Sequence, residues 1–294
     1  MKDIQEILAI ACSVGWGAAE ILQSYYHRTA DDSDLKVEYK QNEPVTVADV
    51  AVSEYILNEL QTALGNEYFG YISEETYKTQ TALTQEWVWI IDPLDGTRDF
   101  IEKTGQYAVH IALVKDKRPV LAVVAVPEMQ KLYYATLGGG AFVETSDSHS
   151  KTLRDRQSQK LQVSSRQNIS DLTVVVSRSH RNQRLDYLLQ KLPFANQKAV
   201  GSVGCKIATI VEQNADVYIS LSGKSAPKDW DIAAPELILT EAGGKYTHFD
   251  GTPLQYNTGD VSQWGGILAS NGQCHQALCQ EAENILAEFD NLKN

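Results

Sequence analysis

The stretch WVWIIDPLDGTRDF, residues 87–100, constrains the fold of this chain more than any other feature. Its first five residues are apolar, which predicts a buried β-strand, and the apolar run stops at Asp92. A buried carboxylate is costly unless a cation or hydrogen-bond donors accompany it. The chain must therefore fold so that this strand lies in a core while a partner reaches Asp92.

The residues after the strand indicate what that partner is. Asp92 and Asp95 would lie on one tight turn whose backbone Pro93 fixes. Hard divalent cations such as Mg²⁺ take oxygen ligands, so this turn suits one. Gly96 lets the backbone approach a ligand closely, and the Gly96 and Thr97 amides could face an anion if a helix starts here. The alternative is a surface Asp-Pro turn with capping aspartates, which the apolar strand disfavours.

Three further acidic positions are ambiguous when each is taken alone. Glu74 follows a short strand in ISEE, where adjacent glutamates are usually just solvated. Asp49 falls in the first turn of a predicted helix, where the helix dipole favours a negative charge. Asp231 is expected to cap the helix of IAAPELILTEA, with Pro235 in its first turn. Capping alone is a sufficient structural reason for Asp231.

The pattern of apolar residues divides the chain into two styles of architecture. Helical spacing predicts a long amphipathic helix near the N-terminus and a second helix over residues 47–64. Residues 106–144 indicate a β-meander, in which the glycine-rich residues 138–142 form a hairpin turn rather than a phosphate loop. After residue 160, strand and helix patterns alternate, which is typical of an α/β arrangement.

Residues 145–160 are polar and almost free of large apolar side chains, so they are the best candidate boundary. We therefore expect an N-terminal α+β domain over residues 1–155, with an antiparallel sheet and the metal-binding motifs. We expect a C-terminal α/β domain over residues 156–294.

Charge and cysteine usage exclude several classes of function. The formal net charge of −12 argues against long nucleic acid or an anionic membrane as a partner. A small phosphorylated substrate stays compatible, because a bound cation reverses the local sign. The four cysteines form no C-x-x-C pair, which favours a reduced, cytoplasmic compartment. The apolar run over residues 7–19 is preceded by Asp3 and Glu6 and is too short to span a bilayer, so we interpret it as a core helix.

Together these elements resemble the inositol monophosphatase-type superfamily of Mg²⁺-dependent phosphatases. The resemblance is carried by SEE (73–75), WIIDPLDGT (89–97) and WDIAAPELILTEAGG (230–244). Its 3′(2′),5′-bisphosphate nucleotidase branch is the most similar, through SRSHRNQ (177–183), GSVGCK (201–206) and KDWDIAAPELIL (228–239). The resemblance implies an α/β fold class, a layered α-β-α-β-α sandwich of the sugar-phosphatase type.

The resemblance also implies a metal site with two or three Mg²⁺ ions. One ion would be held by Glu74, Asp92 and the carbonyl of Leu94. A second would be held by Asp92, Asp95 and Asp231, with Asp92 bridging the two. A third, weaker ion would lie near Glu74.

Catalytic and phosphate-binding roles follow from the same resemblance. Thr97, hydrogen-bonded to Asp49, would orient the attacking water and relay its proton. Oxygens of the reacting phosphate would meet the Gly96 and Thr97 amides, and Asp231 would also contact the substrate.

Substrate selection is expected from the C-terminal half. His180, Ser202 and Lys206 match positions that line the nucleotide site in the family, and Lys206 could pair with the phosphate that is not cleaved. The alternatives are a strand-end histidine with a local bond and a snorkelling helix lysine. Some relatives carry an arginine after the strand that DVYISL resembles, whereas this chain offers only Lys224 and Lys228.

The function implied is Mg²⁺-dependent hydrolysis of 3′-phosphoadenosine 5′-phosphate to AMP and phosphate, beside sulfur metabolism and with sensitivity to lithium. The alternative on the same scaffold is an inositol monophosphatase or a sugar (fructose-1,6-) bisphosphatase. A catalytically silent regulator that binds metal or nucleotide is a rival of another class, which the presence of every expected ligand disfavours. No nucleic acid polymer and no membrane insertion is expected.

Overall fold

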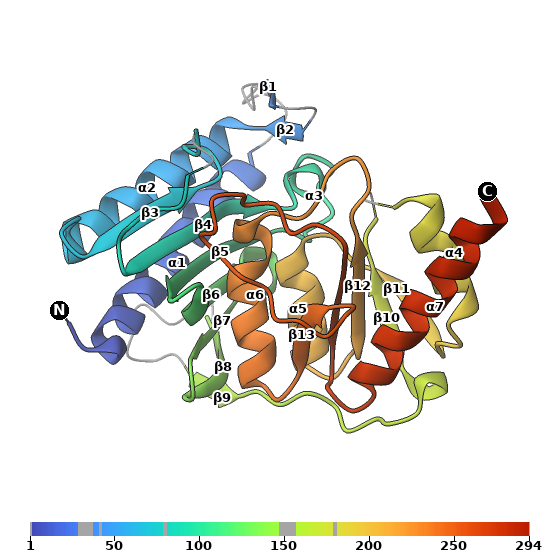
Figure 1. Ribbon diagram of the computed structural model, residues 1–294. Coiled ribbons are helices and arrows are strands. Elements are labelled where there is room, and N and C mark those ends of the chain that lie inside the picture. The colour runs from blue at the N-terminus through green and yellow to red at the C-terminus, as the bar shows by residue number, and fades with distance from the viewer. Residues whose placement is uncertain are drawn as a thin grey trace.

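The computed structural model describes residues 2–28, 38–40, 43–78, 81–146, 157–178 and 181–293. Its helices and sheets stack in five layers (Figure 1). Helices α1 (Ile4–Tyr26) and α2 (Val47–Leu64) cover one face of a seven-stranded sheet, and α5 (Val203–Val211) and α6 (Asp229–Glu241) lie between that sheet and a five-stranded one. Helices α4 (Gln183–Lys191) and α7 (His275–Lys293) cover the far face. The predicted layered α-β-α-β-α fold is confirmed.

The seven-stranded sheet has the order β3-β4-β5-β6-β7-β8-β9. Its strands are β3 (Phe69–Ser73), β4 (Trp87–Asp95), β5 (Ala108–Lys115), β6 (Arg118–Val126), β7 (Lys131–Thr136), β8 (Gly140–Thr145) and β9 (Gln157–Lys160). The predicted meander and its glycine hairpin are confirmed, because β5 to β8 pair antiparallel with short connections. The sheet is not wholly antiparallel as predicted, since β3 and β4 run parallel. A parallel pair needs a crossover of about a dozen residues, which residues 74–86 supply.

Strand β4 does not end at Asp92 as the apolar pattern suggested. It continues to Asp95, and its pairing with β5 passes from Asp92–His110 directly to Asp95–Ala108. The irregularity falls at Pro93 and its neighbour, as expected for a residue without a backbone N–H to donate to the ladder. Both aspartates therefore lie at the C-terminal end of β4, one on each side of the bulge.

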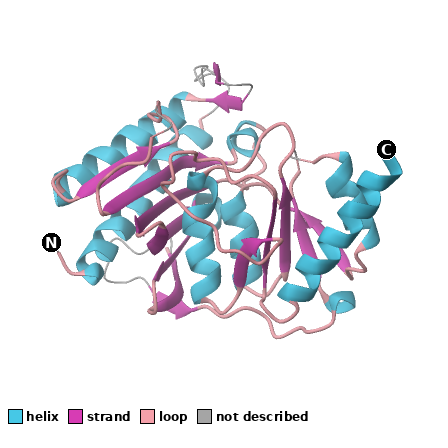
Figure 2. Cartoon of the chain, in the orientation of Figure 1, coloured by secondary structure: helices cyan, strands magenta, loops and turns pink. Residues whose placement is uncertain are grey.

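The five-stranded sheet has the order β11-β10-β12-β14-β13 and mixes parallel with antiparallel pairs. Its strands are β10 (Thr173–Val176), β11 (Asn196–Ala199), β12 (Val217–Leu221), β13 (Lys245–His248) and β14 (Gly266–Ser270). Smaller elements are the hairpin β1 (Glu38–Lys40) and β2 (Glu43–Val45), the short helix α3 (Thr97–Ile101), and the 3₁₀ turns η1 (Pro127–Met129) and η3 (Ile169–Asp171). Figure 2 shows long connecting loops running between the two sheets.

The start of α6 differs from the prediction. The helix begins at Asp229, so Asp231 is its third residue rather than its cap, and Pro235 lies inside it rather than in its first turn. The Asp231 carboxylate accepts a hydrogen bond from the backbone N–H of Lys228 at 2.8 Å. This bond stabilises the first turn of the helix, so the helix begins two residues earlier than predicted. Because α6 is buried between the sheets, tertiary packing overrides the cost of an internal proline.

The two predicted domains share a core. One cluster of buried side chains joins Val124 of β6 and Ile90 of β4 to Ile238 of α6 and Ile207 of α5. The strand β9 also pairs with β8, so residues just beyond position 155 complete the first sheet. The division of the chain at residue 155 stays a prediction.

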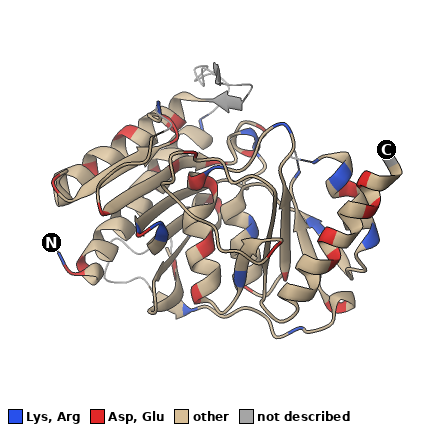
Figure 3. Ribbon diagram, in the orientation of Figure 1, with Lys and Arg blue, Asp and Glu red and all other residues tan. Residues whose placement is uncertain are grey.

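Helix α1 is the single helix among the described residues that is long and apolar enough to cross a membrane by composition. Its residues Ile7, Ala11 and Leu22 are fully buried in a cluster with the seven-stranded sheet, which confirms the prediction of a core helix. Charged residues gather instead on the outer helices α4 and α7 (Figure 3). There Arg184 and Asp290 form an exposed ion pair at 2.7 Å.

Candidate active site

The Asp92 carboxylate is almost completely buried at the bulge of β4. Within the described residues it accepts one hydrogen bond, from the backbone N–H of Leu94 at 3.0 Å. Burial raises its pKa well above the ordinary value, and the nearby charges of Glu74, Asp95 and Asp231 raise the pKa further. Four carboxylates from three parts of the chain therefore lie close together here. For Glu74 and Asp231, the sequence alone allowed a purely structural role.

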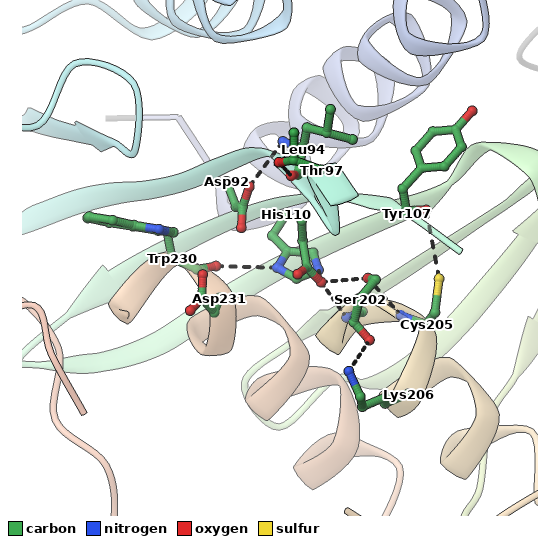
Figure 4. Close-up of polar contacts among 12 residues, drawn as sticks. Asp92, Leu94, Thr97, Tyr107, His110, Ser202, Cys205, Lys206, Trp230 and Asp231 are labelled. Atoms are coloured by element: carbon green, nitrogen blue, oxygen red, sulfur yellow. Dashed lines mark hydrogen bonds and ion pairs between the residues drawn. The ribbon is translucent and has the colours of Figure 1, made fainter. Parts of the chain in front are cut away.

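Glu74 and Asp231 come from two elements that neighbour β4. Glu74 directly follows β3, and its backbone N–H donates to the carbonyl of Ile91 in β4 at 3.2 Å. Asp231 lies in the first turn of α6, and the side chain of Asp92 extends from β4 toward that turn (Figure 4). Parallel pairing of β3 with β4 thus sets Glu74 beside Asp92, while packing of α6 on the sheet brings Asp231.

Asp95, unlike Asp92, is surrounded by hydrogen-bond donors. Its Oδ2 accepts hydrogen bonds from Ser202 Oγ at 2.5 Å and from the backbone N–H of Gly204 at 2.9 Å. Nε2 of His110 lies 3.2 Å from the same oxygen. Burial would raise the pKa of Asp95, but contacts with His110, Lys206 and Ser202 outweigh it and lower the pKa to about 2. Asp95 is thus a carboxylate in a cluster of donors and positive charge.

The predicted contact between Thr97 and Asp49 is present. The Thr97 hydroxyl lies 3.2 Å from Asp49 Oδ1 and 3.1 Å from the carbonyl of Leu94. The other oxygen of Asp49 accepts the backbone N–H and the hydroxyl of Thr46 at 2.7 and 2.6 Å, in a capping box at the start of α2. Burial raises the pKa of Asp49, and the bonds from Thr46 and Thr97 oppose that rise. A threonine hydroxyl has one proton, so Thr97 donates to one of its two acceptors at a time.

Gly96 connects the bulge to helix α3 and could not be another residue without rearrangement. Its φ of +90° lies in the left-handed region, and it is the N-cap of α3. A Cβ there would meet the Gln106 carbonyl at 3.0 Å and Cβ of Ser202 at 3.2 Å. A helix does start at Thr97, which meets the condition set for the Gly96 and Thr97 amides to face an anion, while their contact with phosphate stays a prediction.

Ser202 and Lys206 lie on helix α5 beneath the site. Ser202 is a buried N-cap with φ of +48°, an uncommon conformation for a residue with a side chain. Lys206 is only 3% exposed, and its Nζ donates to the Ser202 carbonyl at 3.0 Å. Burial lowers the pKa of Lys206, opposed chiefly by Asp95. The snorkelling alternative for Lys206 is therefore wrong, and its contact with a substrate phosphate stays a prediction.

Of the remaining substrate-binding predictions, His180 lies outside the described residues. Lys228 donates from Nζ to Ser262 Oγ at 2.9 Å, which fastens the start of α6 to the loop before β14.

His110 is a residue of the site that was not predicted from the sequence. This residue is fully buried in β5 opposite Asp92, and its Nδ1 lies 3.3 Å from the carbonyl of Trp230. A signal was available: His110 is the one imidazole in the apolar run YAVHIALV, at a position where a buried strand calls for an apolar side chain.

The donor set fits Mg²⁺. In the described ranges, no three Asp, Glu, His or Cys side chains already enclose a common point as the ligands of an ion would. Magnesium nevertheless keeps several waters and needs only one or two carboxylates, so a complete protein cage is not required. The poorly paired Asp92, with three acids around it, is the feature that a divalent cation would stabilise.

Comparison with known proteins gives consistent matches over the chain. The model of the inositol monophosphatase family matches residues 3–287. The 3′(2′),5′-bisphosphate nucleotidase CysQ of Aggregatibacter actinomycetemcomitans is 34% identical over 257 residues, covering 86% of this chain and 87% of that protein. The protein of the same name from Escherichia coli K12 is 30% identical over 247 residues, covering 83% and 92%.

Solved structures agree with these matches. CysQ from Bacteroides thetaiotaomicron, described as a bacterial member of the inositol monophosphatase family, has a TM-score of 0.73 and 28% identity, covering 91% of this chain and 98% of that one. An inositol monophosphatase from Anabaena has a TM-score of 0.75 and 25% identity, covering 96% and 97%.

Proposed function

The chain belongs to the inositol monophosphatase family, and from this premise we propose that it is a Mg²⁺-dependent phosphomonoesterase that hydrolyses 3′-phosphoadenosine 5′-phosphate to AMP and phosphate. The curated relatives named above support the nucleotide as substrate, since both carry the name of a bisphosphate nucleotidase. The observation that supports the metal-dependent chemistry is the buried, singly hydrogen-bonded Asp92 surrounded by Glu74, Asp95 and Asp231.

The ligands proposed for Mg²⁺ are the side chains of Glu74, Asp92, Asp95 and Asp231 and the carbonyl of Leu94. Bound there, Mg²⁺ would supply Lewis-acid stabilisation of the charge that develops on the transferred phosphoryl group. Asp95 already has donors from Ser202 and Gly204, so these bonds fix its orientation before any ion binds.

Thr97 and Asp49 are proposed to orient the attacking water and to accept its proton. When the Thr97 hydroxyl donates to Asp49, its lone pairs are free to accept a hydrogen bond from water. The raised pKa of buried Asp49 favours proton acceptance through Thr97, as a general base requires. Thr46 holds the second oxygen of Asp49, which fixes the direction of the pair.

The neighbouring amides at the start of α3 are proposed to contact the reacting phosphate. Gly96 brings this backbone close to the site without a side chain in the way. The leaving ribose oxygen would then point toward α6 and Asp231, and the second phosphate toward α5. We further propose a cytoplasmic location and inhibition by lithium.

A second candidate is an inositol monophosphatase, which the likeness to the Anabaena structure favours. The test is release of inorganic phosphate with 3′-phosphoadenosine 5′-phosphate, inositol 1-phosphate and fructose 1,6-bisphosphate, each with Mg²⁺ and with a chelator. We expect the highest kcat/KM with the nucleotide and loss of all activity with the chelator.

Each other outcome points to a named rival. Equal or better use of inositol 1-phosphate would replace the nucleotidase by the second candidate. No phosphate release from any of the three, with Mg²⁺ binding retained, would favour the catalytically silent regulator.

A further inference from the structure

His110 is a buried polar residue for which packing alone gives no reason. It is 0% exposed and lies on the face of β5 that contacts α5 and α6. Within the described residues, its Nε2 makes no hydrogen bond of acceptable geometry, although Asp95 Oδ2 lies only 3.2 Å away. An apolar side chain would fill the same space without leaving a polar atom unsatisfied.

The imidazole lies against three elements that carry a proposed metal ligand or its support, namely α6, β4 and α5. Nδ1 lies 3.3 Å from the carbonyl of Trp230, the residue before Asp231 in α6. Nε2 faces the bulge of β4 through Asp95. On the third side, a Cβ added to Gly204 of α5 would come within 2.4 Å of Nε2, so α5 packs directly on the ring. Figure 4 shows His110 between Trp230 and Ser202.

We propose that His110 is a positioning residue that sets the distance between Asp95 on β4 and the first turn of α6 that carries Asp231. The inference rests on the proposed function, because the atoms it positions are the ligands proposed for Mg²⁺. The rigid ring packs between the Trp230 carbonyl on α6 and Asp95 Oδ2 on β4, 3.3 and 3.2 Å from its two nitrogens, so the size of the ring sets the separation of the two elements. Removing a group that contacts and orients a metal ligand, without binding the metal itself, typically weakens metal affinity by about 10- to 100-fold.

The test is calorimetric titration of Mg²⁺ into the metal-free protein without substrate, together with its melting temperature. His110→Ala removes both ring contacts. His110→Gln keeps an amide near the position of Nε2 and therefore near Asp95. Val114→Ala is the matched control, because Val114 is equally buried on the same face of β5 but far from the acids.

We expect His110→Ala to weaken Mg²⁺ binding by about 10- to 100-fold. We expect His110→Gln to recover most of that loss, and Val114→Ala to lower the melting temperature without changing the Mg²⁺ affinity.

Unchanged Mg²⁺ affinity in His110→Ala would overturn the inference, as would equal losses in all three variants. Failure of the wild-type protein itself to bind Mg²⁺ would instead count against the proposed function. If His110→Ala does not fold, His110→Leu, which fills the site but also lacks both ring nitrogens, takes its place. Weaker Mg²⁺ binding in His110→Leu than in His110→Gln then supports the inference, and unchanged affinity in His110→Leu overturns it.

Discussion

Two buried aspartates in different regions of the molecule have contrasting surroundings. Asp92 lies near the C-terminal end of β4 in the seven-stranded sheet and is 1% exposed, while Asp216 directly precedes β12 of the five-stranded sheet and is 0% exposed. Asp216 accepts hydrogen bonds from Ser164 Oγ, from Arg166 Nη1 at 2.8 Å and from the backbone N–H of Thr173 at 2.9 Å. Among the residues that the structure describes, Asp92 accepts one, from the backbone N–H of Leu94.

The difference is that Asp216 has hydrogen-bond donors and a cation around it, whereas Asp92 has one donor among the described residues and other acids nearby. The partners of Asp216 include a cation and two neutral donors, which offset the cost of burying its charge. Asp92 has other acids as its neighbours, which add to that cost. The contrast predicts that replacing Asp92 will damage function and that replacing Asp216 will damage stability.

The largest expected effect is that of Asp92→Asn. A bridging ligand carries charge that both ions need, so we expect near-total loss of phosphate release with the fold retained. The raised pKa of Asp92 means that its charged form opposes folding of the metal-free protein above about pH 4, where the unfolded carboxyl is ionised. The metal-free variant should therefore melt no lower than the wild type at pH 7, as measured by circular dichroism. Full activity at saturating Mg²⁺ would contradict the two-ion assignment.

The next effect in size is that of Thr97→Ala. Loss of the hydroxyl that contacts Asp49 should lower kcat by about 10²- to 10⁴-fold, the range for a group that orients or deprotonates the nucleophile. The Mg²⁺ affinity should change little, because the Thr97 hydroxyl is not a proposed ligand. Thr97→Ser, which keeps the hydroxyl, is the matched control and should retain most activity. A loss of Mg²⁺ binding with normal turnover at high metal would show that the role is misassigned.

The third prediction tests the other side of the comparison. Asp216→Ala removes the acceptor for three donors and leaves Arg166 without its partner. Because Arg166 is half exposed and water can solvate it, the lost ion pair contributes little, and the main cost is that of the buried donors left without an acceptor, about 1–3 kcal/mol. Denaturant unfolding measures the loss. The kcat per folded molecule should stay at the wild-type value, and a fall to the level of Asp92→Asn would remove the distinction between the two acids.

The smallest expected effect concerns Lys206, the cation beside Asp95. A charge-assisted contact with the second phosphate contributes about 1.5–3 kcal/mol, so Lys206→Ala should lower kcat/KM for 3′-phosphoadenosine 5′-phosphate by about 10- to 100-fold. Hydrolysis of inositol 1-phosphate, which lacks that phosphate, should barely change. Equal loss with both substrates would mean that buried Lys206 serves Asp95 and the Ser202 carbonyl instead, with Lys224 and Lys228 next to test.

Local sequence patterns predicted much of the fold. Helix α2 spans residues 47–64 as predicted, and the glycine hairpin lies between β7 and β8. Errors arose where tertiary packing acts. The proline of α6 is tolerated inside the helix because the helix is buried on both sides, and the parallel pairing of β3 depends on how the chain returns over residues 74–86. Neither depends on the spacing of nearby residues.

The order of the amino acids was enough to predict that an apolar strand runs into Asp-Pro-Leu-Asp-Gly-Thr and to locate further acids at Glu74 and Asp231. It could not separate Asp92 from Asp216, since each borders an apolar strand and their difference lies in partners from other elements. It also gave no reason to connect His110 with Asp95 or Lys206 with the Ser202 carbonyl. The folded structure was needed to show that Asp216 has three donors and Asp92 has one among the described residues. The reason is that the energy of a buried charge depends on groups brought near it from distant parts of the chain.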